Sequence, residues 1–313
     1  TVQSMFTPHE AVFLTVETCT PFKCTEETTI DQEATAALRA EQPLGRFVGL
    51  DIYLDRGHLA ISEVGEAWAS SQNWTEFLAS LSNLPFYRAM SFTLVFIFTV
   101  TPMVIVLGLL IALAVNSIYA RLRGVVIFFS LLPFVITPLI GALVLYWMID
   151  SRGILGNLLQ WMAGDPSLSL KASTGLMWVS LIVYGIWHAA TFAFVIFYAG
   201  LQTLPQDQME AAQIDGASRL QRVRYVILPH LMPLVMFVTL IQLMDNFRVF
   251  EPIIGFNAEA HATSLSWAIF NDLGGETRQF SSAAATSVIT IIGVAILLTP
   301  VLIRTWRDFR RKV

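Results

Sequence analysis

A stripe of polar side chains interrupts the apolar stretch that ends near residue 246. Thr239, Gln242 and Asn246 stand at i, i+3 and i+7, so they share one face of a helix. Their hydroxyl and amide groups both donate and accept hydrogen bonds, as the hydroxyls of a polar molecule require. The alternative is that this stripe hydrogen-bonds to a neighbouring helix and serves packing alone.

Trp187 and His188 form a second candidate pair, within the apolar stretch SLIVYGIWHAATFAF. An indole ring can stack on the face of a sugar, and a histidine inside a membrane is tolerated where it faces a cavity. Each has an ordinary alternative: Trp187 as packing, and His188 as a hydrogen-bond partner between helices. Asp245 and Arg248 stand at i, i+3, which favours a local ion pair.

Sequence patterns of known catalytic and metal sites are absent. There is no G-x-x-x-x-G-K-[ST] loop, no H-E-x-x-H pair and no G-x-S-x-G elbow, and the five histidines are scattered. The formal charge of −4 comes without a basic, aromatic-rich patch for nucleic acid. We therefore expect neither an enzyme, nor a metal site, nor a nucleic-acid partner.

The elements that position these residues follow from composition. Hydrophobic residues make up 55% of the 313, charged residues only 13%, and the mean hydropathy is +0.63. Soluble domains carry about 25% charge. Five uncharged windows are long enough to span a bilayer, which takes about 20 residues. We expect an all-α polytopic membrane protein with five transmembrane helices, in the windows 88–121, 123–150, 171–207, 224–245 and 278–304.

The distribution of Lys and Arg predicts the orientation. The links 116–124 and 201–229 and the tail 304–313 carry ten of the nineteen basic residues, whereas 150–173 and 251–280 carry three. Basic links face the cytoplasm. Residues 1–87, with twelve acidic and four basic residues, are then an external segment, and 88–313 the transmembrane domain.

Signals within the external segment are weaker. Residues 11–16 favour a strand or a buried turn, and 31–40 and 74–90 favour helices, the latter along the outer membrane surface. Cys19 and Cys24 are the only cysteines. An oxidising external compartment favours a disulfide between them, and two free or metal-binding thiols are the alternative.

Residues 201–229 are a charged stretch between two apolar segments, and they predict a helix, a bend and a second helix. Pro205 suits a first turn, and Met209 to Ile214 favour helix. Gly216 readily takes the positive φ that ends a helix. We expect the second helix to run from Ala217 to Leu228-Pro229, with one apolar face made of Leu220, Val223 and Ile227.

This stretch resembles the EAA loop of membrane subunits of ATP-binding cassette (ABC) importers. The resemblance is carried by Glu210-Ala211-Ala212, Asp215-Gly216-Ala217 and Ile227-Leu228-Pro229. Ala199 to Pro229 is similar to the carbohydrate-uptake branch, which includes maltose, trehalose and glycerol-phosphate permeases. An ordinary amphipathic cytosolic loop is the alternative. The resemblance covers roughly 84–313 but departs after Asn246, where EPIIGFNAEA replaces a glycine-rich segment.

The resemblance implies a permease subunit in a bacterial cytoplasmic membrane that carries a sugar or related polar solute. Its expected partners are two ATPase subunits, which bind ATP and Mg²⁺, a second homologous permease and an external solute-binding protein; this chain itself would hold no cofactor. The resemblance also implies a further helix before Thr1, which would give the intact subunit six transmembrane helices. Alternatives are another solute class, such as a polyol or sugar phosphate, a secondary transporter without an ATPase, or a receptor-like protein.

The resemblance also assigns residues to two sites. ATPase coupling would fall to Glu210, Ala211, Ala212, Asp215, Gly216 and Ala217. The solute path would be lined by Phe134, Thr137, Pro138, Trp187, His188, Thr239, Gln242 and Asn246.

Overall fold

The computed structural model describes residues 6–7, 13–20, 23–30, 33–34, 36–37, 46–47, 49–71, 73–274 and 279–310. The chain divides into two compact units. The first comprises 1–88 with 268–291, and the second comprises 89–267 with 292–313. The division at Arg88 lies next to the predicted domain boundary, although the first unit also takes in residues from the C-terminal third.

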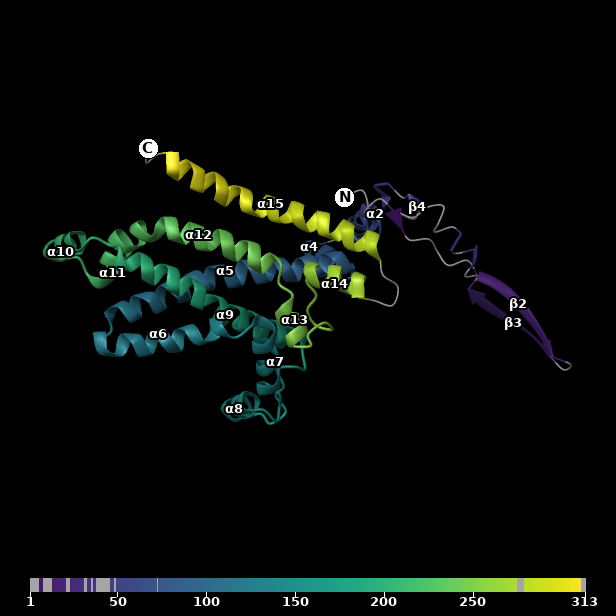
Figure 1. Ribbon diagram of the computed structural model, residues 1–313, viewed down its shortest axis with the longest axis horizontal. Coiled ribbons are helices and arrows are strands. Elements are labelled where there is room, and N and C mark those ends of the chain that lie inside the picture. The colour runs from purple at the N-terminus through teal and green to yellow at the C-terminus, as the bar shows by residue number, and fades with distance from the viewer. Residues whose placement is uncertain are drawn as a thin grey trace. The chain divides into compact units, whose positions relative to one another are not determined.

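Among the described residues, four helices are long and apolar enough to cross a membrane: α5 (Pro85–Ser117), α9 (Thr174–Gln202), the helix through α12 (Leu228–Phe247) and α15 (Phe280–Arg310). Figure 1 shows α5, α9 and α12 running along one another in the second unit, and α9 packs against α12. These helices match four of the five predicted windows.

The fifth window, 123–150, is not one straight span. It covers most of α6 (Ala120–Val135) and all of α7 (Pro138–Met148), which are bent by 97° relative to each other. Ile136 and Thr137 between them are both extended. For Thr137 the reason is that the residue before a proline avoids the helical region. The predicted five spans are therefore found only if this bent pair counts as one.

Small residues bring the helices of the second unit close together. A Cβ on Gly108 of α5 would lie 2.6 Å from Ala193 Cβ and 2.9 Å from Phe194 N of α9. A Cβ on Gly255 of α13 (Glu251–Gly255) would meet α7 at Ala142. Glycine lets helix backbones approach in this way, and large side chains then fill the core around them: Phe92, Tyr184, Phe194, Phe197, Leu231 and Ile253.

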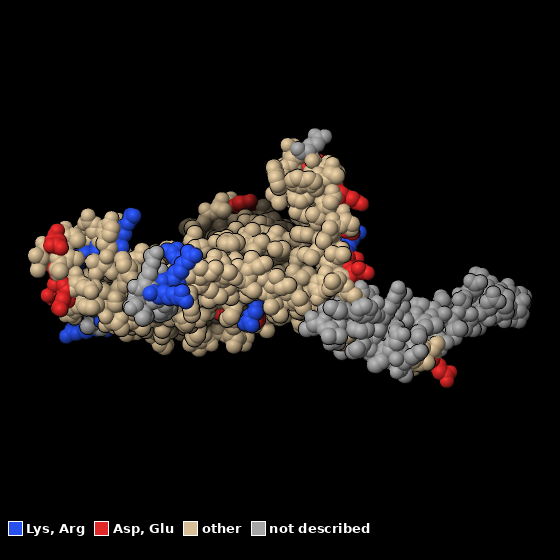
Figure 2. All heavy atoms as spheres, turned by 90° about the horizontal axis from the view of Figure 1, so that it is seen from above, with Lys and Arg blue, Asp and Glu red and all other residues tan. Residues whose placement is uncertain are grey.

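Short elements connect the long ones. The link after α7 contains α8 (Ile154–Ala163), and the link after α9 contains α10 (Gln206–Ile214), α11 (Arg219–Arg222) and a π-helical segment (Val223–Ile227). In Figure 2 basic side chains of the second unit gather near α10 and α11 and near the C-terminal end of α15, beside a largely uncharged band. These two regions lie in the links 201–229 and 304–313, two of the three on which the predicted orientation depends.

The first unit adds strands that an all-α prediction does not include. β1 (Phe6–Thr7) pairs with β4 (Arg46–Phe47), and β2 (Phe13–Thr20) with β3 (Lys23–Ile30), both antiparallel. The strand expected at 11–16 is confirmed from Phe13 on and continues to Thr20. Of the helix expected at 31–40, residues 33–34 and 36–37 are helical, and the rest lies outside the described residues.

Helices complete the first unit. They are α2 (Asp51–Leu54), α3 (Ile61–Ser70), α4 (Trp74–Leu81), most of α14 (Leu265–Gly274) and the start of α15. His58 is buried, and its Nε2 lies 3.2 Å from the Ser282 carbonyl oxygen; the carbonyl accepts, so Nε2 carries the proton. Ser282 Oγ donates to Asp272 Oδ2 at 2.6 Å. The loop before α3 is thereby tied to the first turn of α15.

Candidate functional site

The segment between α9 and α12 folds as a helix, a tight bend and a second helix, as predicted. α10 begins after Pro205, which is extended, and Asp207 lies in its first turn, where a carboxylate favours the helix dipole. α10 ends in a Schellman motif, in which the Ala217 N–H donates to Ala212 O at 2.9 Å and the Gly216 N–H to Gln213 O at 3.0 Å. Gly216 has the positive φ of +77° that this motif requires.

The second helix starts at Ser218 with a capping box. The Ser218 N–H donates to Gln221 Oε1 at 2.7 Å, and the Gln221 N–H donates to Ser218 Oγ at 3.3 Å. The predicted end at Leu228-Pro229 is wrong, because the helix continues from Arg219 to Phe247. Pro229 falls in the first turn of α12, directly after the π-helical segment Val223–Ile227. The π-helical turn changes the backbone hydrogen bonds from i→i+4 to i→i+5 next to Pro229, and this accommodates a proline that has no N–H to donate.

Residues 203–227, called the α10–α11 loop below, present a mixed acidic and apolar surface. Glu210 is exposed, and its carboxylate makes no hydrogen bond or ion pair with the described part of the chain. Ile214, one turn further on the same face, is 86% exposed, and Leu220 beyond the bend is 77% exposed. The prediction that Leu220 packs on the same face as Ile227 is wrong. Ile227 is buried, whereas Leu220 lies outside the packed part of the helix.

The other predicted coupling residues support this surface. Ala211, Asp215 and Gly216 are exposed, whereas Ala212 and Ala217 are half-buried. Met209 and Val223 pack against the core of the second unit and hold the loop in place. Exposed apolar side chains around a rigid bend, beside an unpaired carboxylate, are the features of a surface that docks onto another protein.

Five of the predicted path residues come together at the bend between α6 and α7. His188 Nε2 lies 3.2 Å from the Ile136 carbonyl oxygen, so Nε2 is the protonated nitrogen and donates. Tyr184 Oη donates to Pro138 O at 2.6 Å, and Thr191 Oγ1 to Ser130 O at 3.1 Å. α9 thus donates hydrogen bonds to backbone carbonyls around the break between α6 and α7. Of the two roles considered for His188, this contact fits that of a hydrogen-bond partner between helices.

Other side chains at the bend remain accessible. Phe134 is 57% exposed and stacks on Phe192 with the ring centroids 6.5 Å apart. Trp187 is 42% exposed and lies 6.2 Å from the Tyr184 ring. Thr137 and Pro138 at the break are also exposed. Two aromatic rings and an opened backbone therefore face outward at the bend.

The remaining three path residues lie on α12, in a different setting. Gln242 and Asn246 are 4% and 8% exposed. Asn246 Nδ2 donates to Thr101 Oγ1 of α5 at 3.1 Å and to Gln242 Oε1 at 3.4 Å, and Thr239 Oγ1 donates to Val235 O of its own helix. The contacts of this stripe fit the packing alternative. Thr101, the partner from α5, was missed, because nothing in the sequence distinguishes it from Thr93 and Thr99 in the same apolar window.

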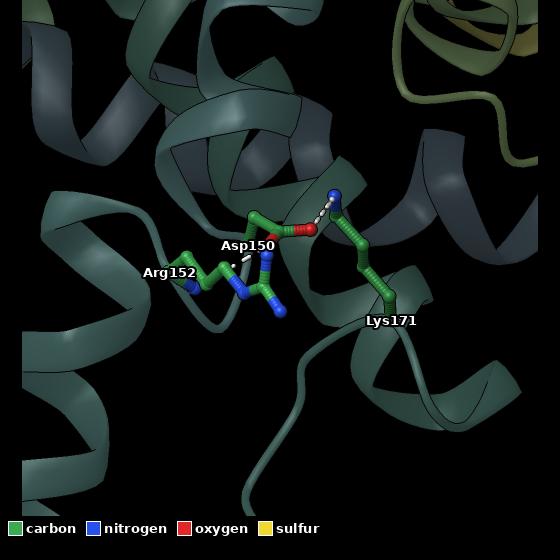
Figure 3. Close-up of polar contacts among 3 residues, drawn as sticks. All are labelled: Asp150, Arg152 and Lys171. Atoms are coloured by element: carbon green, nitrogen blue, oxygen red, sulfur yellow. Dashed lines mark hydrogen bonds and ion pairs between the residues drawn. The ribbon is translucent and has the colours of Figure 1, made fainter.

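Two charged pairs mark the ends of helices. Asp245 and Arg248 lie 3.8 Å apart, as the i, i+3 spacing predicted. Figure 3 shows a second pair, whose residues the sequence indicated only as window boundaries: Lys171 Nζ lies 2.8 Å from Asp150 Oδ2. Lys171 Nζ also lies 3.5 Å from the centre of the Tyr146 ring. Asp150 Oδ1 also accepts from the Arg152 N–H at 3.2 Å. The hydrogen bond from Lys171, and to a lesser degree that from the Arg152 N–H, lowers the pKa of Asp150. The ion pair links the end of α7 to the segment before α9.

Comparison with known proteins places this architecture in a family. Residues 77–307 match the family described as binding-protein-dependent transport system inner membrane component. A probable ABC transporter permease of Sinorhizobium fredii is 30% identical over 76% of this chain and 75% of its own length. A trehalose/maltose transport system permease of Thermococcus litoralis is 28% identical, over 75% and 79%.

A solved structure shows the same fold. It is a bacterial ABC transporter involved in the import of the acidic polysaccharide alginate; it aligns with a TM-score of 0.63 at 24% identity, over 88% of this chain and 97% of that chain. The matched family segment contains α5, α9, α12 and the α10–α11 loop in full, and α15 as far as residue 307. The chain is therefore a multi-pass membrane protein of the family of binding-protein-dependent transport system inner membrane components.

Proposed function

We propose that this chain is the permease subunit of an ABC importer for a sugar or related polar solute, and that its α10–α11 loop couples ATP hydrolysis on a partner to transport. The observation that carries the proposal is the loop itself. It contains the Schellman bend that ends α10, and it exposes two aliphatic side chains and a carboxylate without a partner in the described part of the chain. Membership of the transport family supports a coupling role for that surface.

The loop suits a docking role for a mechanical reason. α10 precedes the bend, and the second helix runs without a break into α12, so a push on α10 is carried into a transmembrane helix. Glu210 offers its carboxylate to hydrogen-bond donors of the partner, and Ile214 and Leu220 offer apolar area. The partner would be one of two ATPase subunits. ATP and Mg²⁺ would bind there, since this chain has no phosphate-binding loop.

The solute path is proposed at the bend between α6 and α7. Trp187 and Phe134 expose aromatic faces there, and Thr137 and His188 add polar atoms. A sugar suits this mixture, because its ring face stacks on aromatic rings and its hydroxyls hydrogen-bond. The relative from Thermococcus litoralis is named for trehalose and maltose. Trp187→Ala is then expected to reduce uptake while ATPase association is unchanged; normal uptake would place the path elsewhere.

Other components complete the proposed importer. A second, homologous permease subunit would form the other half of the path in the bacterial inner membrane, and a soluble binding protein would deliver the solute from outside. On that outer side, the backbone register places Cys19 directly opposite Cys24 in the β2–β3 hairpin. Directly opposed residues in an antiparallel pair are within the Cα separation that a disulfide needs. We propose that these two cysteines form a disulfide.

The experiment is solute uptake into proteoliposomes that contain the assembled complex and internal ATP. Glu210→Ala removes a charge-assisted contact worth about 1.5–3 kcal/mol, which corresponds to roughly a 10- to 150-fold loss of ATPase affinity. We expect uptake to fall accordingly. Gln208→Ala is the matched control, because Gln208 is exposed on the same helix and points away from the Glu210 face. Equal uptake by both variants, or uptake without ATP, would refute the proposal.

A further inference from the structure

Two short helices of the first unit, α3 and α4, are each strongly amphipathic. Each presents apolar side chains at i, i+3 and i+7, namely Ile61, Val64 and Trp68 in α3 and Trp74, Phe77 and Leu81 in α4, joined by Leu78. The acidic residues lie on the opposite faces: Glu63, Glu66 and Glu76. A helix with such a stripe normally buries it.

The apolar faces of these helices are nevertheless exposed. Ile61 and Trp68 are both 57% exposed, Trp74 is 69% and Leu78 is 60%, and neither helix contains a buried residue. The rings of Trp68 and Trp74 meet edge to face with centroids 5.2 Å apart, and Trp68 meets Phe77 at the same distance. The two faces therefore adjoin, and residues 61–81, called the amphipathic hairpin below, present one apolar surface.

The hairpin is held beside the start of a membrane span. α4 ends at Leu81 and α5, a candidate span, begins at Pro85. The three residues between them can extend about 10 Å at most. At the other end of the hairpin, Tyr87 Oη in the first turn of α5 donates to the Leu59 carbonyl at 2.8 Å. Both ends of the hairpin are thus fixed close to the point at which the chain enters the bilayer.

We propose that the amphipathic hairpin lies in the outer membrane interface, with its apolar face in the boundary between headgroups and acyl chains. Tryptophan, phenylalanine and leucine are the side chains that interfacial helices bury there. The opposite face stays in water. Ser62 Oγ donates a hydrogen bond to Glu63 Oε2 at 2.8 Å. This hydrogen bond is the main cause that lowers the pKa of Glu63, so the Glu63 carboxylate is charged at neutral pH.

The charge pattern specifies how the hairpin binds lipid. Residues 57–87 contain no Lys or Arg, so attraction to anionic headgroups cannot hold it. Burial of apolar side chains must do so, and this contribution is not screened by salt. The proposal concerns the anchoring of the first unit and does not depend on the solute or on the ATPase.

The test uses nitroxide labels on the full chain in phospholipid nanodiscs, with Cys19 and Cys24 replaced by serine. Leu78→Cys places the label on the apolar face, and Ala79→Cys, also exposed on α4, places it on the other. Collision rates are measured with oxygen, which concentrates in lipid, and with a nickel chelate, which stays in water. We expect oxygen to dominate at Leu78 and the chelate at Ala79, and this contrast to be the same at roughly 0.05 and 0.5 M salt.

Three outcomes would overturn the proposal. Equal chelate access at both positions would mean that the apolar face is in water. Shielding of the Leu78 label from both reagents would mean that protein, such as an external binding partner, covers the face. A contrast that weakens at high salt would mean that charge, rather than apolar burial, holds the hairpin.

Discussion

Replacing Gly216 by valine tests whether the bend of the α10–α11 loop matters to the partner that docks there. Gly216 has a φ of +77°, and a Cβ built on it would meet no atom within 4 Å. The cost of the change therefore comes from the backbone alone and not from a clash. A residue with a Cβ in the left-handed region costs about 1–2 kcal/mol, which lowers the population of the bend roughly 5- to 30-fold.

The assay is the affinity of a labelled ATPase subunit for the permease complex in nanodiscs, measured by fluorescence anisotropy. We expect a loss of about 5- to 30-fold for Gly216→Val, and a smaller loss for Gly216→Asn, because asparagine tolerates the left-handed region better. Gly164→Val is the matched control. Gly164 has a φ of +67°, also has open space around it, and ends α8 far along the chain from the loop.

The reasoning is refuted if Gly216→Val binds the ATPase as tightly as the wild type. It is also refuted if Gly164→Val weakens binding as much as Gly216→Val does, since general strain would then explain both results.

Three further predictions concern sidedness, the two cysteines and the α12 stripe. Asn157→Cys should react with an impermeant thiol reagent from outside sealed cells and Ser218→Cys should not; the reverse would invert the orientation. Intact mass under non-reducing conditions should be about 2 Da below that of two free thiols if the cysteines are paired, and alkylation of both without reductant would exclude the disulfide. Thr101→Val leaves the buried Asn246 amide short of a partner, so the free energy of unfolding in detergent should fall by about 1–3 kcal/mol. An unchanged value would mean that the stripe does not serve packing.

The α10–α11 loop was predictable because its signals are local. The proline before the first helix and the glycine after it each act within one turn. The capping box of Ser218 and Gln221 is equally local but was not used, and the expected start of the second helix at Ala217 falls just before the observed cap. The continuation through Pro229 was not predictable, because the π-helical segment that accommodates the proline has no residue signature of its own. Leu220 was misplaced for a related reason: periodicity gives its face of the helix but not where the packing stops.

The membrane spans were predictable from the uncharged windows, with one exception. The window 123–150 has the length and composition of a span, and only the pair of prolines at Pro133 and Pro138 indicates the 97° bend. The α12 stripe shows a different limit. The spacing of Gln242 and Asn246 correctly gives one shared face, but whether that face meets a solute or Thr101 depends on tertiary packing. Sequence periodicity contains no information on that choice.

Photo-cross-linking from the loop tests the central claim most directly. A photoreactive side chain replaces Ile214, which is 86% exposed in the α10–α11 loop, and in a matched variant it replaces Met162, which is 69% exposed on α8. The complex is irradiated in the membrane and the adducts are identified by mass spectrometry. We predict that position 214 captures a subunit with a phosphate-binding loop and that position 162 does not. Failure of position 214 to capture an ATPase, in a complex that still transports, would contradict the account.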